Sequence, residues 1–210
     1  MKIFTLTNDR NYEEITKFIE NKITEKDQII VWTYSLPKKF RLEVNTGCKV
    51  EGGSRYEESV SSTSSLTEYF PFDVINLDFS SQDPISENGR IEREIKSLEE
   101  TIKLQREKQG EEKGFTLIYT TLLNSCPIDK EQVIRYSNAI QITGGSGFQL
   151  SNFQNNINEQ NEKMEFIKKT LEEIFSKYSY ITHKLDKANF RLSNEQKVIF
   201  SAIGIIKKGV

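Results

Sequence analysis

Apolar and polar positions alternate along the chain with two different periods, which predict strands and helices in turn. Apolar runs of strand length, rich in β-branched and aromatic residues, lie at 2–7, 27–35, 72–79 and 114–123. Apolar residues at helical spacing form stripes that begin at Tyr12, Ile91, Val133 and Met164. Strands that alternate with helices favour a parallel sheet with helices on both faces.

The end of the chain departs from this alternation. Three apolar segments, "YITHKL", "NFRLS" and "KVIFSAIGIIK", follow one another with only the polar turn 194–196 before the last. They predict a C-terminal antiparallel strand pair. We find no internal repeat and no linker long enough to divide the chain. The predicted fold class is therefore α/β, with residues 1–210 as a single doubly wound domain, mostly parallel, that closes with the antiparallel pair.

The segments between the main elements carry weaker patterns. "RLEV" (41–44) and "CKVEGG" (48–53) are compatible with short strands, and Gly52-Gly53 marks a turn. The serine-rich segment 59–65 is predicted as a loop, with a helix running into Tyr69 as the alternative. Residues 144–147, "GGSG", are predicted as a loop hinge.

Composition narrows the functional classes. The chain has 210 residues and a formal net charge of -2, which argues against a general surface for polyanions such as nucleic acid. The two cysteines, Cys48 and Cys126, have no metal-ligand spacing, and His183 alone cannot build a multi-histidine site. There is no apolar run of membrane length and no secretory pattern. We expect a cytoplasmic protein with idle thiols and no bound metal.

The run "FDVINLDF" (72–79) ends close to a carboxylate. Ligands of open α/β sheets bind outside the carboxyl ends of the strands, near the point where the strand order reverses. Asp78 lies at such an end, where water or a bound polar group can solvate its charge. Asp73 lies at the opposite end of the strand and is interpreted as a cap or a solvent-exposed residue.

This order of elements resembles the second half of class I S-adenosylmethionine-dependent methyltransferases, over about residues 70 to 206. In that family an acid at the tip of the fourth strand lies beside the methyl donor and the substrate. The resemblance places Asp78 in this catalytic position. It implies that Phe79 and Ser80 contact the substrate, with core packing as the alternative for Phe79.

The first half of the chain departs from the family pattern. The family binds its donor with a glycine-rich turn after the first strand, but "LTNDRNYEE" (6–14) contains no glycine. The family's ribose-binding acid at the end of the second strand has no counterpart in "VWTYS" (31–35). Thr7, Asn8 and Asp9 are the remaining candidates for cofactor contacts. Binding of S-adenosylmethionine is therefore expected to be weak or lost.

Three functions stay open, and with them the question of whether the chain is an enzyme. The first is a methyltransferase-like accessory or partner-dependent subunit of a bacterial system, with anti-phage defence as one context. The second is an active methyltransferase with an atypical donor site. The third is a nuclease or nucleotide-processing enzyme with a carboxylate-bound metal. A protein partner or a homo-oligomer is expected, without membrane binding. Nucleic acid stays open as a partner, although the net charge does not indicate it.

Overall fold

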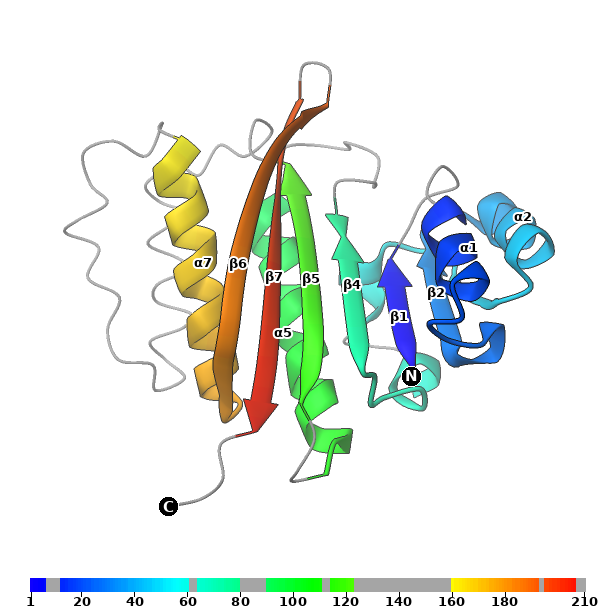
Figure 1. Cartoon of the computed structure of the whole chain (residues 1–210), viewed down its shortest axis with the longest axis horizontal. Coiled ribbons are helices and arrows are strands. Elements are labelled where there is room, and N and C mark those ends of the chain that lie inside the picture. The colour runs from blue at the N-terminus through cyan, green and yellow to red at the C-terminus, as the bar shows by residue number, and fades with distance from the viewer. Residues whose placement is uncertain are drawn as a thin grey trace.

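A computed structural model describes residues 1–6, 12–60, 64–79, 90–110, 114–122, 160–192 and 195–206. Its centre is a seven-stranded sheet in the order β3-β2-β1-β4-β5-β7-β6 (Figure 1). The strands are β1 (Ile3–Leu6), β2 (Ile29–Thr33), β3 (Lys49–Gly52), β4 (Val74–Asp78), β5 (Phe115–Leu122), β6 (Tyr180–Leu192) and β7 (Glu195–Ile206).

The strands from β3 to β5 are parallel, and β7 runs antiparallel to both of its neighbours, β5 and β6. The strands predicted at 72–79 and 114–123 are confirmed as β4 and β5, which are neighbours in the sheet and pair from Val74↔Thr116 to Asp78↔Thr120. The strand order reverses between β1 and β4. This reversal creates the switch point at which open α/β sheets bind ligands.

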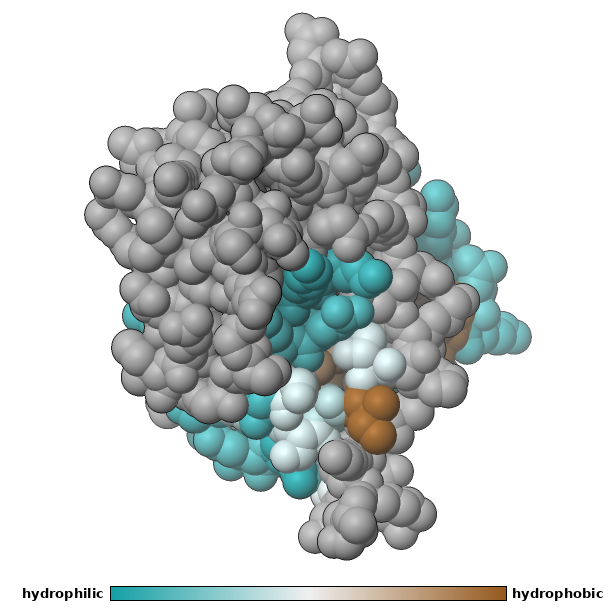
Figure 2. All heavy atoms as spheres, turned by 90° about the vertical axis from the view of Figure 1, so that its left-hand side faces the viewer, coloured by the Kyte–Doolittle hydropathy of each residue, from teal (hydrophilic) through white to brown (hydrophobic). Residues whose placement is uncertain are grey.

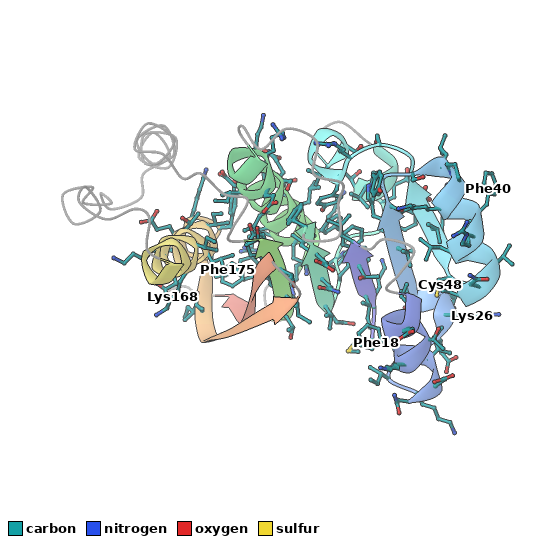
Figure 3. All side chains as sticks on the ribbon, turned by 90° about the horizontal axis from the view of Figure 1, so that it is seen from above. Phe18, Lys26, Phe40, Cys48, Lys168 and Phe175 are labelled. Atoms are coloured by element: carbon teal, nitrogen blue, oxygen red, sulfur yellow. The ribbon has the colours of Figure 1, made fainter. Side chains whose placement is uncertain are left out.

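Helices cover both faces of the sheet (Figures 1 and 3). The apolar side chains of α1 and α2 pack on one face, and those of α3, α4, α5 and α7 pack on the other. The described helices are α1 (Tyr12–Glu20), α2 (Leu36–Thr46), α3 (Tyr56–Ser59), α4 (Ser64–Thr67), α5 (Arg90–Lys108) and α7 (Gln160–Lys177), with a 3-10 turn at Lys26–Gln28.

The face under α5 and α7 has an aromatic core. The Phe79 ring lies 5.7 Å from that of Tyr119, and the Phe115 ring lies 5.7 Å from that of Phe175, both in edge-to-face arrangements. Such pairs add about 0.5–1.5 kcal/mol to the free energy gained by burying their area. The face under α1 and α2 has a smaller, mostly aliphatic core, made of Ile3, Ile15, Ile29, Val31, Leu42, Cys48 and Val50.

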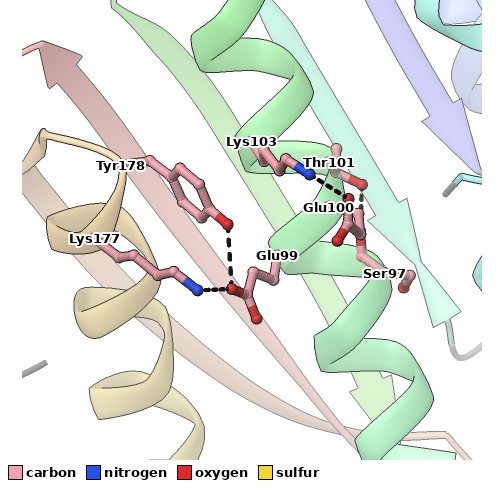
Figure 4. A network of polar contacts seen from close by, with 7 residues as sticks. All are labelled: Ser97, Glu99, Glu100, Thr101, Lys103, Lys177 and Tyr178. Carbon is pink, nitrogen blue, oxygen red and sulfur yellow. Dashed lines mark hydrogen bonds and ion pairs between the residues drawn. The ribbon is translucent and has the colours of Figure 1, made fainter. Parts of the chain in front are cut away.

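Polar contacts connect α5 to α7 at the surface (Figure 4). Lys177 Nζ forms an ion pair with Glu99 Oε1, and the Tyr178 hydroxyl donates to the same oxygen at 3.2 Å. Burial of Tyr178, together with the neighbouring carboxylate of Glu99, raises the pKa of its hydroxyl. The hydroxyl therefore stays protonated and acts as a donor throughout the physiological range.

Two local predictions are wrong. Residues 41–44 belong to α2 and not to a strand, because Pro37 suits the first helical turn and Gly47 ends the helix with φ 67°. Residues 64–67 form α4, so the predicted loop 59–65 is partly helical. The segment 48–53 does contain a strand, β3. The predicted helix stripe from Val133 and the predicted loop hinge 144–147 lie outside the described residues.

None of the described helices combines the length and the apolar character that a membrane crossing requires.

Candidate functional site at the carboxyl edge of the sheet

The switch point between β1 and β4 brings together strand ends from separate parts of the chain. The last β1 residue, Leu6, pairs with Trp32 on one side and with Leu77 on the other. Thr33 and Asp78 each lie one residue beyond these pairs, so they lie on either side of the carboxyl end of β1. The sheet thereby places two polar residues, 45 positions apart in sequence, on either side of one strand end.

The face that is covered by α1 and α2 changes character along the strands. Near the amino ends it carries Ile3, Ile29, Val31 and Val74, which all contact the aliphatic core. Side chains alternate between the two faces of a sheet, so residues two positions further lie on this same face. The residues two positions beyond Ile3, Val31 and Val74 are polar. With Asp78 and its neighbour on β5 they form what we call the polar row: Thr5, Thr33, Asn76, Asp78 and Thr120.

Most of the polar row is buried. Thr5, Thr33, Asn76 and Thr120 are between 0% and 7% exposed. Asn76 Nδ2 donates to Thr5 Oγ1 at 3.2 Å, which links β4 to β1 across the switch point. Thr33 Oγ1 is buried and has no hydrogen-bond partner within the described part of the chain. An unsatisfied buried hydroxyl costs about 1–3 kcal/mol, so Thr33 lowers the stability of the fold.

The two acids of the β4 segment have different surroundings. Asp78 is the last residue of β4 and is half-buried opposite Thr120. Asp73 is exposed before the start of the strand, where its Oδ2 accepts a hydrogen bond of 2.7 Å from the Lys2 backbone N–H. The interpretation of Asp73 as a capping residue agrees with this contact. The catalytic role of Asp78 stays a prediction.

The predicted substrate residue Phe79 lies in the aromatic core. Its side chain is 0% exposed, and its ring lies 6.5 Å from Tyr56 and 5.7 Å from Tyr119. Core packing, the alternative named for this residue, is the role that these contacts describe. Ser80 and the predicted cofactor residues Thr7, Asn8 and Asp9 lie outside the described residues, so their roles stay predictions.

At the end of β2, the backbone of Gly52 and Gly53 packs against Thr33, and the basic side chain of Lys38 contacts the next residue, Tyr34. A Cβ on Gly52 would lie 1.9 Å from the Thr33 carbonyl oxygen, so only glycine fits there, with φ +118°. Gly53 N–H donates to the same carbonyl oxygen at 2.9 Å. Beyond Thr33, Lys38 Nζ donates to the Tyr34 hydroxyl at 2.9 Å and lies 4.8 Å from the centre of its ring. This strand end therefore carries a cation instead of a carboxylate.

The polar row offers hydroxyls, one amide and one carboxylate. These groups can hydrogen-bond a polar ligand, and Asp78 is the member of the row that can also accept a proton. Within the described residues, no three His, Cys, Asp or Glu side chains are grouped so that they could hold a metal ion. Cys48 is buried, and this burial raises the pKa of its thiol, which keeps it in the poorly reactive protonated form.

The sequence analysis missed a buried carboxylate on the other face. Glu94 of α5 is 1% exposed, and its Oε2 accepts hydrogen bonds from the hydroxyls of Tyr119 at 3.0 Å and Thr121 at 2.8 Å. The helical stripe that begins at Ile91 was recognised, but the polar residues beside it were not predicted to be buried. A signal was present, since buried polar residues recur three or four positions apart beside that stripe, at Glu94, Ser97, Thr101, Gln105 and Gln109.

No model of a protein family and no curated protein sequence matches the chain. The fold is similar to solved methyltransferase structures. The N-methyltransferase NodS from Bradyrhizobium japonicum WM9 is 8% identical with a TM-score of 0.46, and 98% of this chain and 86% of that chain are covered. A protein assigned as an rRNA methylase from Clostridium thermocellum is 10% identical with a TM-score of 0.45, and 99% and 88% are covered.

An O-methyltransferase family protein from Burkholderia thailandensis is 8% identical with a TM-score of 0.42, and 100% of this chain and 52% of that chain are covered. The parallel part of the sheet has the order 3-2-1-4-5, which is typical of the Rossmann-like methyltransferase core. The likeness to these structures is one of fold.

Proposed function

We propose that this chain is a methyltransferase-like protein with an eroded donor site, which acts as a non-catalytic or partner-dependent accessory subunit. The observation that carries the proposal is the absence of a carboxylate from β2 and its end. There the family resemblance implies an acid for the ribose hydroxyls, and this chain has the buried, neutral Thr33 followed by the Tyr34–Lys38 pair. No carboxylate replaces the acid on β2 itself, whose sequence is IIVWT.

The energetic consequence is a weak donor complex. A hydrogen bond to a charged acceptor contributes about 1.5–3 kcal/mol, and the ribose would lose such an acceptor at the end of β2. The sequence after β1 contains no glycine, and a side chain in that turn would occupy space that the methionine part of the donor needs. Each 1.4 kcal/mol changes affinity about tenfold, and the two defects together weaken a micromolar ligand to about millimolar.

The decisive measurement is isothermal titration of the full chain with S-adenosylmethionine and S-adenosylhomocysteine. We expect binding too weak to saturate at millimolar ligand. A dissociation constant below about 50 µM would overturn the proposal in favour of an active methyltransferase. A thermal melt of the same sample ensures that a negative result comes from folded protein.

One observation favours the active enzyme as the second candidate. Asp78 is half-buried at the carboxyl end of β4, whereas the other members of the polar row are buried. In an active enzyme this carboxylate would orient a polar substrate group toward the methyl donor, since methyl transfer needs little beyond alignment.

Matched variants separate these two functions. Asp78→Asn and Asp73→Asn remove one charge each from opposite ends of the same strand segment. If the chain transfers methyl groups, alone or with its partner, Asp78→Asn lowers the rate at least tenfold and Asp73→Asn leaves it unchanged. Equal activities of both variants would exclude Asp78 from the site.

The accessory role can be tested in cells. A bacterial system that depends on this chain, with phage resistance as the first phenotype to score, should lose its function when the gene is deleted. It should regain function with wild type and with Asp78→Asn if the chain is non-catalytic. Rescue by wild type alone would favour the active enzyme.

A further inference from the structure

The junction between β2 and α2 combines an unpartnered buried hydroxyl with the amino end of a helix. Thr33, the last residue of β2, is 0% exposed, and among the described residues its Oγ1 has no hydrogen-bond partner. Tyr34 and Ser35 follow and are half-buried, and α2 begins at Leu36. The buried hydroxyl therefore adjoins a partly exposed segment at the carboxyl edge of the sheet, where open α/β sheets bind ligands.

The Thr33 side chain lies on the side of the sheet where α2 begins. It alternates with Ile29 and Val31, which belong to the aliphatic core under α1 and α2. Gly53 N–H donates to the Thr33 carbonyl at 2.9 Å, and a Cβ on Gly53 would lie 2.6 Å from Leu36 Cδ2. These contacts hold the first residue of α2 beside Thr33, so the unpartnered hydroxyl and the start of the helix share one face and one edge.

The first turn of α2 favours negative charge. The leading backbone N–H groups of an α-helix have no acceptor inside the helix, and the helix dipole makes this end positive. Ser35 occupies the N-cap position of this 11-residue helix without a side-chain capping bond, and the first turn contains no acidic residue. Lys38 lies in the same turn, and its Nζ donates to the Tyr34 hydroxyl at 2.9 Å. An anion at this end would therefore be stabilised by both the dipole and the ammonium charge.

From this arrangement we infer that the end of β2 binds the phosphate group of a nucleotide that is phosphorylated on its ribose. In dinucleotide-binding sheets, an acid near this position accepts from the ribose 2′-hydroxyl, whereas a nearby basic residue accommodates a ribose 2′-phosphate. This chain has the neutral Thr33 and the basic Lys38 there. The phosphate accepts hydrogen bonds from Lys38, from Ser35 and from the first helical turn, and it gives the Thr33 hydroxyl the partner that the fold lacks.

The chemistry of the donors fits this ligand. A phosphate monoester has three acceptor oxygens and a charge of up to about -2. The site offers hydroxyls, backbone N–H groups and one ammonium group, which all donate. The inference rests on one part of the proposed function, the loss of the acid at the end of β2, and it does not depend on the accessory role.

A lysine at the surface does not by itself make such a site. Figure 2 shows the side of the molecule away from α2, where the coloured surface is largely hydrophilic. Lys168 of α7 lies at that end of the molecule (Figure 3). It belongs to the middle of its helix, where backbone N–H groups bond within the helix, so it provides a control for charge alone.

Calorimetric titration of the full chain at low ionic strength tests the inference with adenosine 2′-monophosphate, adenosine and inorganic phosphate. We expect the monophosphate to bind at least about tenfold more tightly than adenosine, because charge-assisted hydrogen bonds form only with the phosphate. Inorganic phosphate should compete with it. Equal affinities for the monophosphate and adenosine, or no competition by inorganic phosphate, would overturn the inference.

Matched variants test the residues. Lys38→Gln and Thr33→Val should each reduce the preference for the monophosphate over adenosine at least about fivefold. Lys26→Gln removes the same charge beside Gly47, at the other end of α2, and should leave the preference unchanged, as should Lys168→Gln. Circular dichroism and thermal melts establish that each variant folds. An equal loss in Lys26→Gln and Lys38→Gln would show unspecific attraction of anions and would contradict the site.

A titration of the same samples with S-adenosylmethionine separates this inference from the proposed function. Weak binding of the donor together with phosphate-dependent binding of the nucleotide supports both. If the donor binds weakly and the monophosphate no better than adenosine, the inference fails and the proposed function stands. Tight binding of the donor together with phosphate-dependent binding of the nucleotide would overturn the proposed function and leave the phosphate site in place.

Discussion

Both faces of the sheet bury polar side chains, but the two faces differ in how completely these side chains are hydrogen-bonded. On the face under α5 and α7, the Glu94 carboxylate accepts hydrogen bonds from Tyr119 and Thr121, within a core dominated by aromatic rings. On the face under α1 and α2, the polar row links Thr5 to Asn76 but leaves Thr33 Oγ1 without a partner in the described chain. The first face uses its polar groups to hold the fold together.

The same comparison holds at the edges of that first face. The Gln105 side-chain amide donates to the Phe72 carbonyl at 2.7 Å and accepts from the Phe72 N–H at 2.9 Å. Both backbone groups of Phe72 are therefore hydrogen-bonded by one side chain. Gln109 accepts from the Tyr180 hydroxyl at 2.7 Å. Satisfied buried networks stabilise a unique packing, whereas an unsatisfied hydroxyl costs stability. We conclude that the buried polar groups stabilise the fold mainly under α5 and α7, whereas the polar row contains an unsatisfied hydroxyl.

We expect the largest loss of stability from a substitution in the aromatic core under α5 and α7. Phe79→Ala removes a fully buried ring between Tyr56 and Tyr119 and should cost about 3–5 kcal/mol. Leu42→Ala, its counterpart on the other face, should cost about 2 kcal/mol, because α2 is peripheral and can relax into the space. Urea denaturation of both variants measures the difference. A larger loss for Leu42→Ala would reverse the comparison.

We expect the next largest loss of stability from removal of the buried Glu94 carboxylate. Glu94→Ala leaves the hydroxyls of Tyr119 and Thr121 without their acceptor and should cost about 2–3 kcal/mol. Tyr119→Phe removes one donor, keeps the acid paired with Thr121 and should cost about 1 kcal/mol. The order of the two unfolding free energies is the measurement. If Glu94→Ala were neutral, the carboxylate would have no structural role.

A substitution in the polar row should increase stability, by a smaller amount. Thr33→Val replaces the unpartnered hydroxyl with a methyl group of similar size and should stabilise the chain by about 1 kcal/mol. The same change at Thr5, which accepts from Asn76, should destabilise it by about as much. Melting temperatures measured with and without candidate ligands show whether the Thr33 hydroxyl binds a ligand. A ligand that stabilises wild type but not Thr33→Val would identify this hydroxyl as a binding group.

The exposed acid of the β4 segment should have little effect. Asp73→Ala loses one solvent-exposed hydrogen bond to the Lys2 N–H and should cost about 0.5 kcal/mol. Unfolding in urea at neutral pH provides the value. A loss of several kcal/mol would mean that the β1–β4 junction depends on this contact.

The smallest effect depends on pH. Partial burial raises the pKa of Glu173, whose Oε2 has no hydrogen-bond partner among the described residues. The folded state then holds this proton more tightly than the unfolded state, so stability falls as pH rises above about 4.5 through the folded pKa. Glu173→Gln should be more stable than wild type at pH 7 by about 0.5 kcal/mol or less, and the difference should vanish near pH 4.

Much of the fold follows from local pattern. The unbroken apolar centre of "FDVINLDF" predicted a central strand, and β4 pairs on both sides. The stripe Ile95, Leu98 and Ile102 predicted α5, and all three residues are buried. These predictions succeed because the period of the apolar residues fixes the type of element and the side that it buries. The missing glycine and the missing acid were likewise visible in the sequence alone.

Other features required the tertiary structure. "RLEV" has the composition of a strand, but Pro37 and Gly47 bound a helix there, and that helix turns Phe40 outward because Leu42 alone reaches the aliphatic core. Glu94 is a charged residue on a helix of mixed charge, and the hydroxyls of Tyr119 and Thr121 on β5, which the chain supplies from elsewhere, favour its burial. Thr33 and Asp78 flank one strand end only through the register of three strands. Local sequence determines period and breakpoints, whereas burial of a polar group and the meeting of distant residues depend on neighbours that the chain supplies from elsewhere.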